Sequence, residues 1–531
     1  MVLTGVTYHR AGVMIVRVLT GILVALALAQ SANATSSTWL EESKSASDAL
    51  ARSVQAGYLS KADEARYVAT LSYARSVRDR VPPLRARLLD HVLAEVAQPK
   101  SPIAPRALAL YGTLQENAAY LDTHRVPDDG TDVTATDGIV YRYFTGKGLE
   151  FHPLANAGQL NSLVAAGDTA NADAMIGALE ARAIEQPNDA LVWEYPFTFG
   201  NAKAPWTSGM AQAVMAQALA RAGRTDLARR AYQAIPGSLD RELLAGPWIR
   251  LYSDTSEVVL NAQLQSAISI GDYATLTGDS GAADYANRLL QTAKTMLPRF
   301  DTGHWSRYSL GEESSLHYQD FVIGLLKTLA KRTGDTTWSD AADRFALYET
   351  EPPLMTGPTV TRLVYPRPED GVRDALVVRF WLSKLSKVAL VVDGKAVDGY
   401  TWAGGWHVFR WTPRALAPGT YPVRLVASST GNPGETDLGS FAVARDTTPP
   451  VLAAAKANGR VYWHAKDAES ACCRIRLEVR RGAEQHVLAF PHARGVAAIP
   501  SGYWDVTVVA RDAAGNPTER NLGLVVGRAA G

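Results

Sequence analysis

Residues 220–235 read ARAGRTDLARRAYQAI, an apolar helical stretch followed by a glycine, a short polar run and an amphipathic helix. Glycine commonly ends a helix in the left-handed conformation, and Thr, Ser or Asp just after it suits the N-cap of the next helix. The residues therefore predict a helical hairpin with a tight turn at Gly223.

This pattern recurs along the first two-thirds of the chain, with successive glycines 55, 55, 56, 55 and 56 residues apart. The first two matches are weaker than the others. Hairpins of such similar length predict an all-α (α/α)6 toroid over residues 35–350. An open solenoid is the alternative, although solenoid repeats are usually shorter. The turn glycines are Gly57, Gly112, Gly167, Gly223, Gly278 and Gly334.

The longer connections between the hairpins are rich in Trp, Tyr and His. They span residues 192–209, 246–258 and 301–318, at comparable phases of the repeat. Loops on a rigid scaffold are the usual place for a binding or catalytic site. We expect these three loops to converge on one mouth of the ring.

The sequence changes character after the last hairpin. A Pro-rich stretch at 349–358 ends the helical pattern, and RDTTPPV at 445–451 marks a second break. Alternating apolar runs, one with an Asp-Gly turn, predict two immunoglobulin-like β-sandwiches at 356–445 and 446–531. GYWDVTVVARDAAGN (502–516) resembles the closing strands of bacterial immunoglobulin-like repeats. We expect both domains to act as spacers or as attachments to a wall or polymer.

The N-terminus carries export signals. Arg17 precedes about a dozen apolar residues, and Ala32-Asn33-Ala34 supplies an A-x-A cleavage site. Residues 1–34 therefore predict a secretory signal peptide cleaved near Ala34, with Met14 as an alternative start. An uncleaved membrane anchor is the alternative, but the apolar run is short for a membrane span. We expect a secreted or cell-surface protein without a stable span after cleavage.

Composition excludes some ligands. The 531 residues carry a formal net charge of +1, so nucleic acid is not an expected partner. No HExxH or other dense ligand cluster is present, so we expect no catalytic metal, and nothing implies a cofactor. The two cysteines, Cys472 and Cys473, are neighbours. Two buried small apolar residues are favoured over a vicinal disulfide.

Three segments together resemble the C-terminal catalytic domain of D-glucuronyl C5-epimerases. They are WTSGMAQAVMAQALARA (206–222), VLNAQLQSAISIGDYA (259–274) and LPRFDTGHWSRYSL…LHYQDFVIGLL (297–326), and the resemblance covers residues 138–352. It implies an enzyme that removes the C5 proton of a glucuronate unit in a polymer and returns a proton to the opposite face. Such chemistry needs a base and an acid on opposite faces of the sugar, and a cation or donor cluster at its carboxylate.

The resemblance implies proton-transfer roles for Tyr308 and Tyr318, and for Tyr252 before the V-L-N helix. The alternative is that these tyrosines merely line a helical core. The family's acidic pair before the third tyrosine is replaced here by Arg250-Leu251. We therefore expect Glu257, Glu312 or Glu313 to supply the missing acid, and Glu257 and Glu313 are the preferred catalytic candidates.

Other polar and aromatic residues of these loops are expected to bind the polymer through charge or ring stacking. They are Arg142, Lys147, His152, Trp193, Glu194, Trp206, Gln212, Arg250, Asn261, His304, Arg307 and His317.

Several functions remain open at this point. The leading hypothesis is a uronyl C5-epimerase-like isomerase acting on an anionic, uronate-containing polysaccharide, whose identity (heparan-like or other) the sequence does not specify. A polysaccharide lyase would start from the same carbanion. A glycoside hydrolase would use two carboxylates, drawn from Glu194, Glu257 and Glu313. A non-catalytic glycan-binding protein is the third class, and a homodimer is an assembly that the sequence permits.

Overall fold

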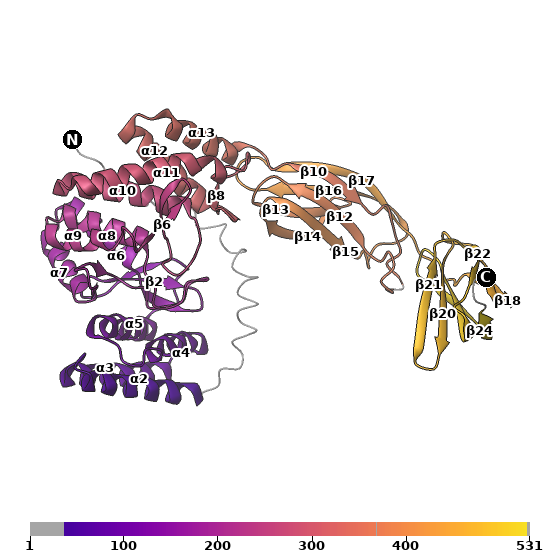
Figure 1. Cartoon of the computed structure of the whole chain (residues 1–531), viewed down its shortest axis with the longest axis horizontal. Helices are drawn as coiled ribbons and strands as arrows, with labels where there is room; N and C mark the ends of the chain where they lie inside the picture. The colour runs from indigo at the N-terminus through magenta and orange to yellow at the C-terminus, as the bar shows by residue number, and fades with distance from the viewer. Residues whose placement is uncertain (1–36, 368, 528–531) are drawn as a thin grey trace. The chain divides into compact units, whose positions relative to one another are not determined.

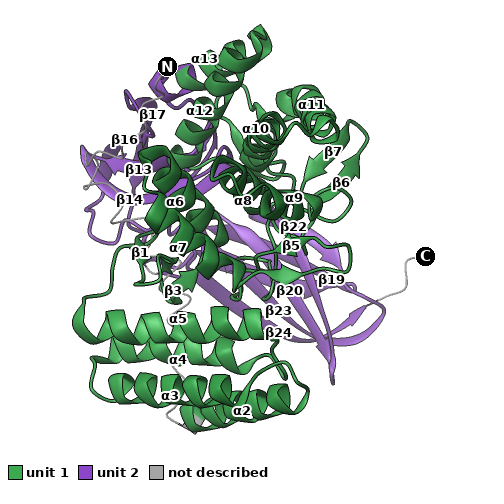
Figure 2. Ribbon diagram, turned by 90° about the vertical axis from the view of Figure 1, so that its left-hand side faces the viewer, with its two compact units in different colours: residues 1–346 green, residues 347–531 purple. Residues whose placement is uncertain are grey.

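The computed structural model describes residues 37–527 except 368, and it divides into two compact units, 1–346 and 347–531 (Figures 1 and 2). The first unit is helical, and the second is built from β-strands, as predicted. Among the described residues, no helix is both long and apolar enough to cross a membrane. The predicted signal peptide lies outside the described residues.

The first unit opens with a four-helix bundle. Its first turn, at Gly57, is confirmed: the glycine has φ +75°, and Ser60 and Asp63 form a capping box at the start of the next helix. The predicted turn at Gly112 is wrong, because this glycine lies inside a helix. A Cβ there would be 2.9 Å from Tyr141 Oη, so glycine permits a close approach instead of a turn. The helices are α2 (Ser37–Gln55), α3 (Lys61–Arg78), α4 (Pro83–Ala97) and α5 (Ala104–Thr123).

Four hairpins follow the bundle, and their glycine turns are confirmed. Gly167, Gly223, Gly278 and Gly334 all have φ between +69° and +73°. The first helices of successive hairpins, α6, α8, α10 and α12, pack side by side. The hairpins are α6/α7 (Pro153–Ala166, Thr169–Glu180), α8/α9 (Gly209–Arg221, Thr225–Gln233), α10/α11 (Leu260–Thr277, Ser280–Met296) and α12/α13 (Leu316–Thr333, Thr336–Thr350).

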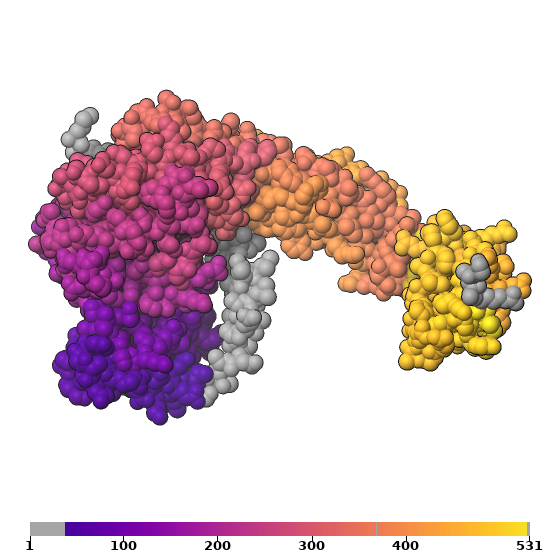
Figure 3. Space-filling model, viewed as in Figure 1, coloured from indigo at the N-terminus to yellow at the C-terminus, as the bar shows by residue number. Residues whose placement is uncertain are grey.

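The described part of the unit forms an arc. The prediction of a closed ring of six hairpins is therefore wrong. α2 and α3 lie at one end of the unit and α12 and α13 at the other in both ribbon views, and the space-filling view shows the same order (Figures 1–3). The bundle meets the hairpins through a small sheet, with α4 and α5 packed on its last strand. The bundle nevertheless shares one hydrophobic core with the hairpins, and this core extends from Trp39 to Leu289. The sheet is β1 (Asp132–Thr134), β2 (Val140–Phe144) and β3 (Gly148–Phe151).

A polar network joins the inner helices at their short-turn end. Asp272 of α10 accepts hydrogen bonds from Gln217 Nε2 (2.6 Å) and Arg221 Nη2 (2.6 Å) of α8 and from Arg332 Nη1 (2.5 Å) of α12. Asn161 of α6 joins through Gln217, at 3.3 Å. Burial alone would raise the pKa of Asp272, but Arg332, Gln217 and Arg221 hold it below its ordinary value. One carboxylate therefore ties three inner helices together.

The long connections each contain a short antiparallel pair of strands that leads into the next hairpin. These pairs are β4–β5 (Ile184–Glu185, Leu191–Val192), β6–β7 (Asp240–Leu243, Gly246–Ile249) and β8–β9 (Arg307–Ser309, Glu312–Glu313), the last after the 3-10 helix η1 (Leu297–Phe300).

The second unit contains two β-sandwich cores, formed by residues 355–443 and 452–525. The predicted Asp-Gly turn is confirmed, since Asp393 and Gly394 both have positive φ between paired strands. The first core lies between sheets β10-β12-β15 and β11-β17-β16-β13-β14, the second between β18-β19-β22 and β21-β20-β23-β24. The strands are β10 (Met355–Val360), β11 (Leu363–Val364), β12 (Leu376–Leu382), β13 (Ser386–Val392), β14 (Lys395–Trp402), β15 (Gly405–Trp411), β16 (Gly419–Ser428), β17 (Gly434–Val443), β18 (Val451–Ala457), β19 (Arg460–Lys466), β20 (Arg474–Arg481), β21 (Glu484–Phe490), β22 (Arg494–Ala498), β23 (Gly502–Arg511) and β24 (Pro517–Gly527).

The expectation for the two cysteines is wrong. Cys472 and Cys473 form a disulfide with each other, in the loop between β19 and β20. Only Cys473 is buried, whereas Cys472 is exposed, so the pair does not behave as two core residues.

We predict that Asp272→Asn lowers the free energy of unfolding of the helical unit by about 1–2 kcal/mol at neutral pH, because Arg221 and Arg332 lose a charged acceptor. The folded-state pKa of Asp272 is depressed, so its contribution is present above the unfolded pKa of about 3.9 and disappears as pH falls through the folded value. Urea unfolding followed by far-ultraviolet circular dichroism measures the difference. Asp284→Asn, at an exposed position on α11, is the control. Equal losses in both variants would contradict the role of the network.

Candidate functional site

Three tyrosines from two long connections and the start of α12 meet at the site. Tyr252 follows β7, Tyr308 lies in β8, and Tyr318 lies in the first turn of α12. The hydroxyl oxygens of Tyr252 and Tyr308 are 3.3 Å apart. The rings of Tyr308 and Tyr318 are 4.8 Å apart between centroids. The sequence prediction that these loops converge is therefore confirmed for these tyrosines.

Local strand pairing fixes these positions. Ser309 bridges to Val259 at the start of α10, and Leu310 N donates to Val258 O at 3.2 Å. Gly209 N, at the start of α8, donates to Arg250 O at 2.9 Å, two residues before Tyr252. A Cβ at Gly209 would lie only 2.7 Å from Leu239 O. Glycine therefore lets the strand that precedes Tyr252 rest directly on the end of α8.

An aromatic wall continues from Tyr252. Trp206 packs edge-on against Tyr252 with centroids 5.1 Å apart, and it stacks on Tyr195 at 3.9 Å with an angle of 2°. The indole Nε1 donates to Phe197 O at 2.8 Å, which holds the ring in place. Both rings are largely buried, with Trp206 5% and Tyr195 3% exposed, so the stack forms a rigid wall behind Tyr252.

Arg142 and His152 complete the basic part of the site. Arg142 Nε and Nη2 donate to the two carboxylate oxygens of Asp132 at 2.7 Å each, and its charge acts on Tyr195 and Tyr318. His152 Nδ1 accepts a hydrogen bond from Ala155 N and caps α6. Burial and then Arg142 hold the pKa of His152 well below its ordinary value. The imidazole is therefore neutral, and Arg142 carries the positive charge.

The tyrosine hydroxyls keep their protons at neutral pH. Burial, with smaller contributions from Tyr318, Glu257 and Glu312, raises the pKa of Tyr252 to about 12, although the Tyr308 hydroxyl opposes the shift. Burial and Tyr252 raise the pKa of Tyr308 further. Partial desolvation raises the pKa of Tyr318, although this residue is 37% exposed, whereas Arg142 lowers it. All three can donate a proton, and none is a ready base.

Two carboxylates act on these tyrosines. Glu257 raises the pKa of both Tyr252 and Tyr308, and Glu312 raises that of Tyr252 and Tyr318. Glu257 is half-buried, whereas Glu312 is exposed. Glu313, which the sequence placed among the catalytic residues, pairs across the hairpin with Arg307.

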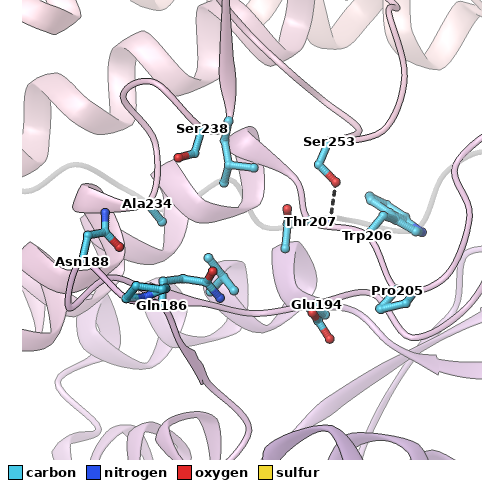
Figure 4. Close-up of a pocket in the computed structure, with 12 residues that line it drawn as sticks. Gln186, Asn188, Glu194, Pro205, Trp206, Thr207, Ala234, Ser238 and Ser253 are labelled. Carbon is cyan, nitrogen blue, oxygen red and sulfur yellow. Dashed lines mark hydrogen bonds between the residues drawn. The ribbon is translucent and has the colours of Figure 1, made fainter. Parts of the chain in front are cut away.

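A cavity of about 430 Å³ lies beside the aromatic wall (Figure 4). None of the three tyrosines lines it, but Trp206 and Ser253 do, so it adjoins the tyrosine cluster. Thr207 N donates to Ser253 Oγ at 3.1 Å across this junction. The polar residues that line the cavity include Gln186, Asn188, Glu194, Thr207, Ser238 and Ser253.

Some predicted binding residues hold the scaffold instead. Trp193 is 3% exposed and donates to Leu179 O, so it belongs to the core. Gln212 donates to Leu191 O and Ala231 O, and Arg250 donates to Asp240 O and Ser253 O. These hydrogen bonds hold loops in place, and none of them is made to one of the three tyrosines. Lys147 acts on buried Glu150, whose pKa is raised by burial and then by Glu95.

The remaining predicted residues lie at or near the site. Glu194 lines the cavity and pairs with Arg106 at 2.9 Å. His317 packs edge-on against Tyr318 at 6.0 Å. Asn261 is 2% exposed, and its Oδ1 has no hydrogen-bond partner among the described residues. His304 and Arg307 are half-buried in the segment that leads to Tyr308.

Phe197, Phe199 and Phe144 were missed by the sequence reasoning, although they pack around Tyr195 and Trp206. A signal was present: in WEYPFTF (193–199) the rings of Tyr195, Phe197 and Phe199 alternate, which is the pattern of one face of an extended chain. Arg106 had no local signal, because it comes from α5 and meets Glu194 across 88 residues of sequence, whereas Asn188 lies just before the 192–209 connection.

Comparison with known proteins identifies the segment that carries the site. Residues 187–346 match the model of the family described as D-glucuronyl C5-epimerase C-terminus. This segment is therefore similar to the C-terminal part of D-glucuronyl C5-epimerases. The predicted resemblance is thereby confirmed for 187–346, within the wider range of 138–352 that the motifs indicated.

Other relatives are distant. An uncharacterised protein of Methanocaldococcus jannaschii is 33% identical over 90 residues, which are 17% of this chain and 29% of that protein. The chain therefore spans less than a third of that relative's length. A cellobiose 2-epimerase from Bacillus thermoamylovorans is 12% identical, covers 50% of this chain and 75% of its own, and has a TM-score of 0.32. Fibronectin(III)-like modules of Clostridium thermocellum CbhA are 13% identical, with coverages of 33% and 94% and a TM-score of 0.24. Likeness at this level says nothing about activity.

The folded protein gains phenolate absorbance between about pH 9 and pH 10.5. We predict that Tyr252→Phe and Tyr308→Phe do not change this gain, because both hydroxyls stay protonated over that interval. The same titration in concentrated urea is the control, since every tyrosine is then exposed. There each variant should lose the signal of one tyrosine. A loss of one tyrosine's signal in the native protein would show that the pKa is not raised.

Proposed function

We propose that the protein is a uronyl C5-epimerase that acts on a uronate-containing polysaccharide and inverts C5 within the polymer. The family match at 187–346 supports a carbohydrate epimerase-like function. The observation that carries the finer proposal is the meeting of Tyr252, Tyr308 and Tyr318, all protonated, with half-buried Glu257 acting on two of them. Inversion at C5 requires an acid and a base on opposite faces of the sugar, and the tyrosines and Glu257 supply both types of group.

In this proposal Glu257 is the base. Its carboxylate accepts the C5 proton, and the electron pair left on carbon spreads into the uronate carboxylate. A tyrosine hydroxyl, that of Tyr308 or Tyr318, then gives its proton to the opposite face of C5. Solvent restores the proton on the phenolate and removes the one on the glutamate, so no net atom is gained or lost. Glu312 is the alternative base, but its exposure places it in water.

Arg142 is proposed to neutralise the substrate carboxylate. Its bidentate pair with Asp132 uses Nε and Nη2, which leaves the Nη1 group for a ligand. The charge also lies close enough to lower the pKa of Tyr318. A cation at this position would stabilise the developing enediolate and favour proton transfer from the neighbouring tyrosine.

The cavity beside Trp206 is proposed to hold a neighbouring sugar unit. It offers an aromatic ring and several amide and hydroxyl groups, the combination that sugars use for stacking and hydrogen bonding. Glu194 in its wall is paired with Arg106, so it is a poor candidate for the catalytic acid of a hydrolase. The proposed setting is outside the cell, where the signal peptide would send the protein and the β-sandwiches would act as spacers.

We predict that Glu257→Gln lowers the rate of C5 hydrogen exchange on the polymer by at least about 100-fold, because it removes the base. Of Tyr308→Phe and Tyr318→Phe, the variant that removes the proton donor should lower the rate by a similar factor. Deuterium entry at C5, followed by proton NMR, measures the rate, and circular dichroism checks folding. Tyr58→Phe, at an exposed position in the N-terminal bundle, is the matched control.

Near-normal exchange in Glu257→Gln with loss in Glu312→Gln would move the base to Glu312. Near-normal exchange in both tyrosine variants would overturn the proposal. Formation of unsaturated chain ends by the wild-type protein would instead identify a lyase, which shares the first proton transfer.

A further inference from the structure

Three aspartates from separate loops meet at one end of the second β-sandwich. Asp446 lies in the connection between β17 and β18, Asp467 directly follows β19, and Asp512 directly follows β23. Their carboxylate oxygens all lie within 4.8 Å of one another. Asp446 is 0% and Asp512 4% exposed, and Asp467 is half-buried.

Each aspartate uses one oxygen to order its own loop. Asp446 Oδ1 accepts from Thr448 N at 3.0 Å, and Asp467 Oδ1 accepts from Ser470 N at 2.6 Å. Asp512 Oδ1 accepts from Gly515 N at 2.7 Å. The loops are thus fixed by main-chain donors.

Two of the three remaining carboxylate oxygens have no partner among the described residues. Oδ2 of Asp446 and Oδ2 of Asp467 are buried, and neither has a hydrogen-bond partner among residues 37–527. Oδ2 of Asp512 accepts from Asn516 Nδ2 at 2.9 Å. A completely buried carboxylate oxygen without a donor is costly, and native proteins rarely leave one. Its presence beside two further carboxylates points to a ligand.

Protein cations do not supply the missing charge. Across the described chain, no Lys, Arg or His makes an ion pair with any of the three aspartates. Arg511, next to Asp512 in sequence, donates to the carbonyl of Gly515 instead. Three carboxylates in a largely buried cluster repel one another unless a cation joins them.

We propose that these aspartates bind a calcium ion, a structural site that is independent of the proposed epimerase activity. The donors are all hard carboxylate oxygens, with no imidazole or thiolate in the group, which favours Ca²⁺ over Zn²⁺. Ca²⁺ also tolerates irregular oxygen shells better than Mg²⁺ does, and water or main-chain carbonyls would complete its shell.

The position gives the ion a structural role. Asn516 Nδ2 donates to Asp446 O at 3.2 Å, so the chain entering the sandwich is already tied to the β23–β24 loop. A bound ion would tie the loop after β19 to the same point. The ion would therefore hold the first residues of the second sandwich against the ends of β19 and β23. This role does not depend on the proposed activity of the helical unit.

The test uses the full chain stripped with EDTA. Calorimetric titration with CaCl2 should show one ion per chain with a dissociation constant on the order of 10–1000 µM. Ca²⁺ should also raise the temperature at which the sandwich unfolds, and Mg²⁺ should do so much less. Asp467→Asn keeps the Oδ1 acceptor of the loop and should weaken Ca²⁺ binding at least about tenfold. Asp505→Asn, exposed on β23, is the matched control and should bind normally.

The Asp467→Asn variant carries a second signature. In EDTA it should unfold at a higher temperature than the wild-type protein, because one repelling charge is gone, and in Ca²⁺ the order should reverse. Absence of Ca²⁺ binding by the stripped wild-type protein at millimolar concentration, with no thermal shift, would overturn the proposal. Equal binding by Asp467→Asn and the wild type would also overturn it.

Discussion

The burial of α8 on all sides is the constraint on which the arrangement of the site depends. Every residue from Gly209 to Ala220 is buried, because the hairpins of α6 and α10 pack on either side of it. Small side chains make this approach feasible, and Gly209 lets the strand before Tyr252 lie against the helix end. The tyrosine is thus placed by backbone packing at one end of the inner helices, while the Asp272 network fixes their spacing at the other.

Local patterns explain why much of the fold was predictable. Glycine turns, Asp caps and the Asp393-Gly394 hairpin are decided by a few adjacent residues, and they were found. Gly112 was misassigned because a helical glycine chosen for the approach of Tyr141 looks the same in sequence as a turn glycine. Ring closure depends on packing between distant helices, for which a single sequence carries no periodic signal.

The site was predictable to the extent that motifs mark it. Tyr252, Tyr308 and Tyr318 were found from their spacing, and the structure brings them together. Trp193, Gln212 and Arg250 hold loops through hydrogen bonds to main-chain carbonyls, a role that a sequence does not distinguish from ligand binding. The candidate base could not be chosen among the glutamates from the sequence alone. The neighbours Glu312 and Glu313, for example, lie on different sides of a short hairpin strand.

In the proposed mechanism, the raised pKa values of the tyrosines make the phenols the acids, and a carboxylate is the base. That division is the central claim, and the most direct measurement is proton NMR of uronate-containing polysaccharides incubated with the wild-type protein in D2O. The account predicts loss of the C5 proton signal and entry of deuterium without chain cleavage. No exchange on any uronate polymer by the folded protein would contradict it.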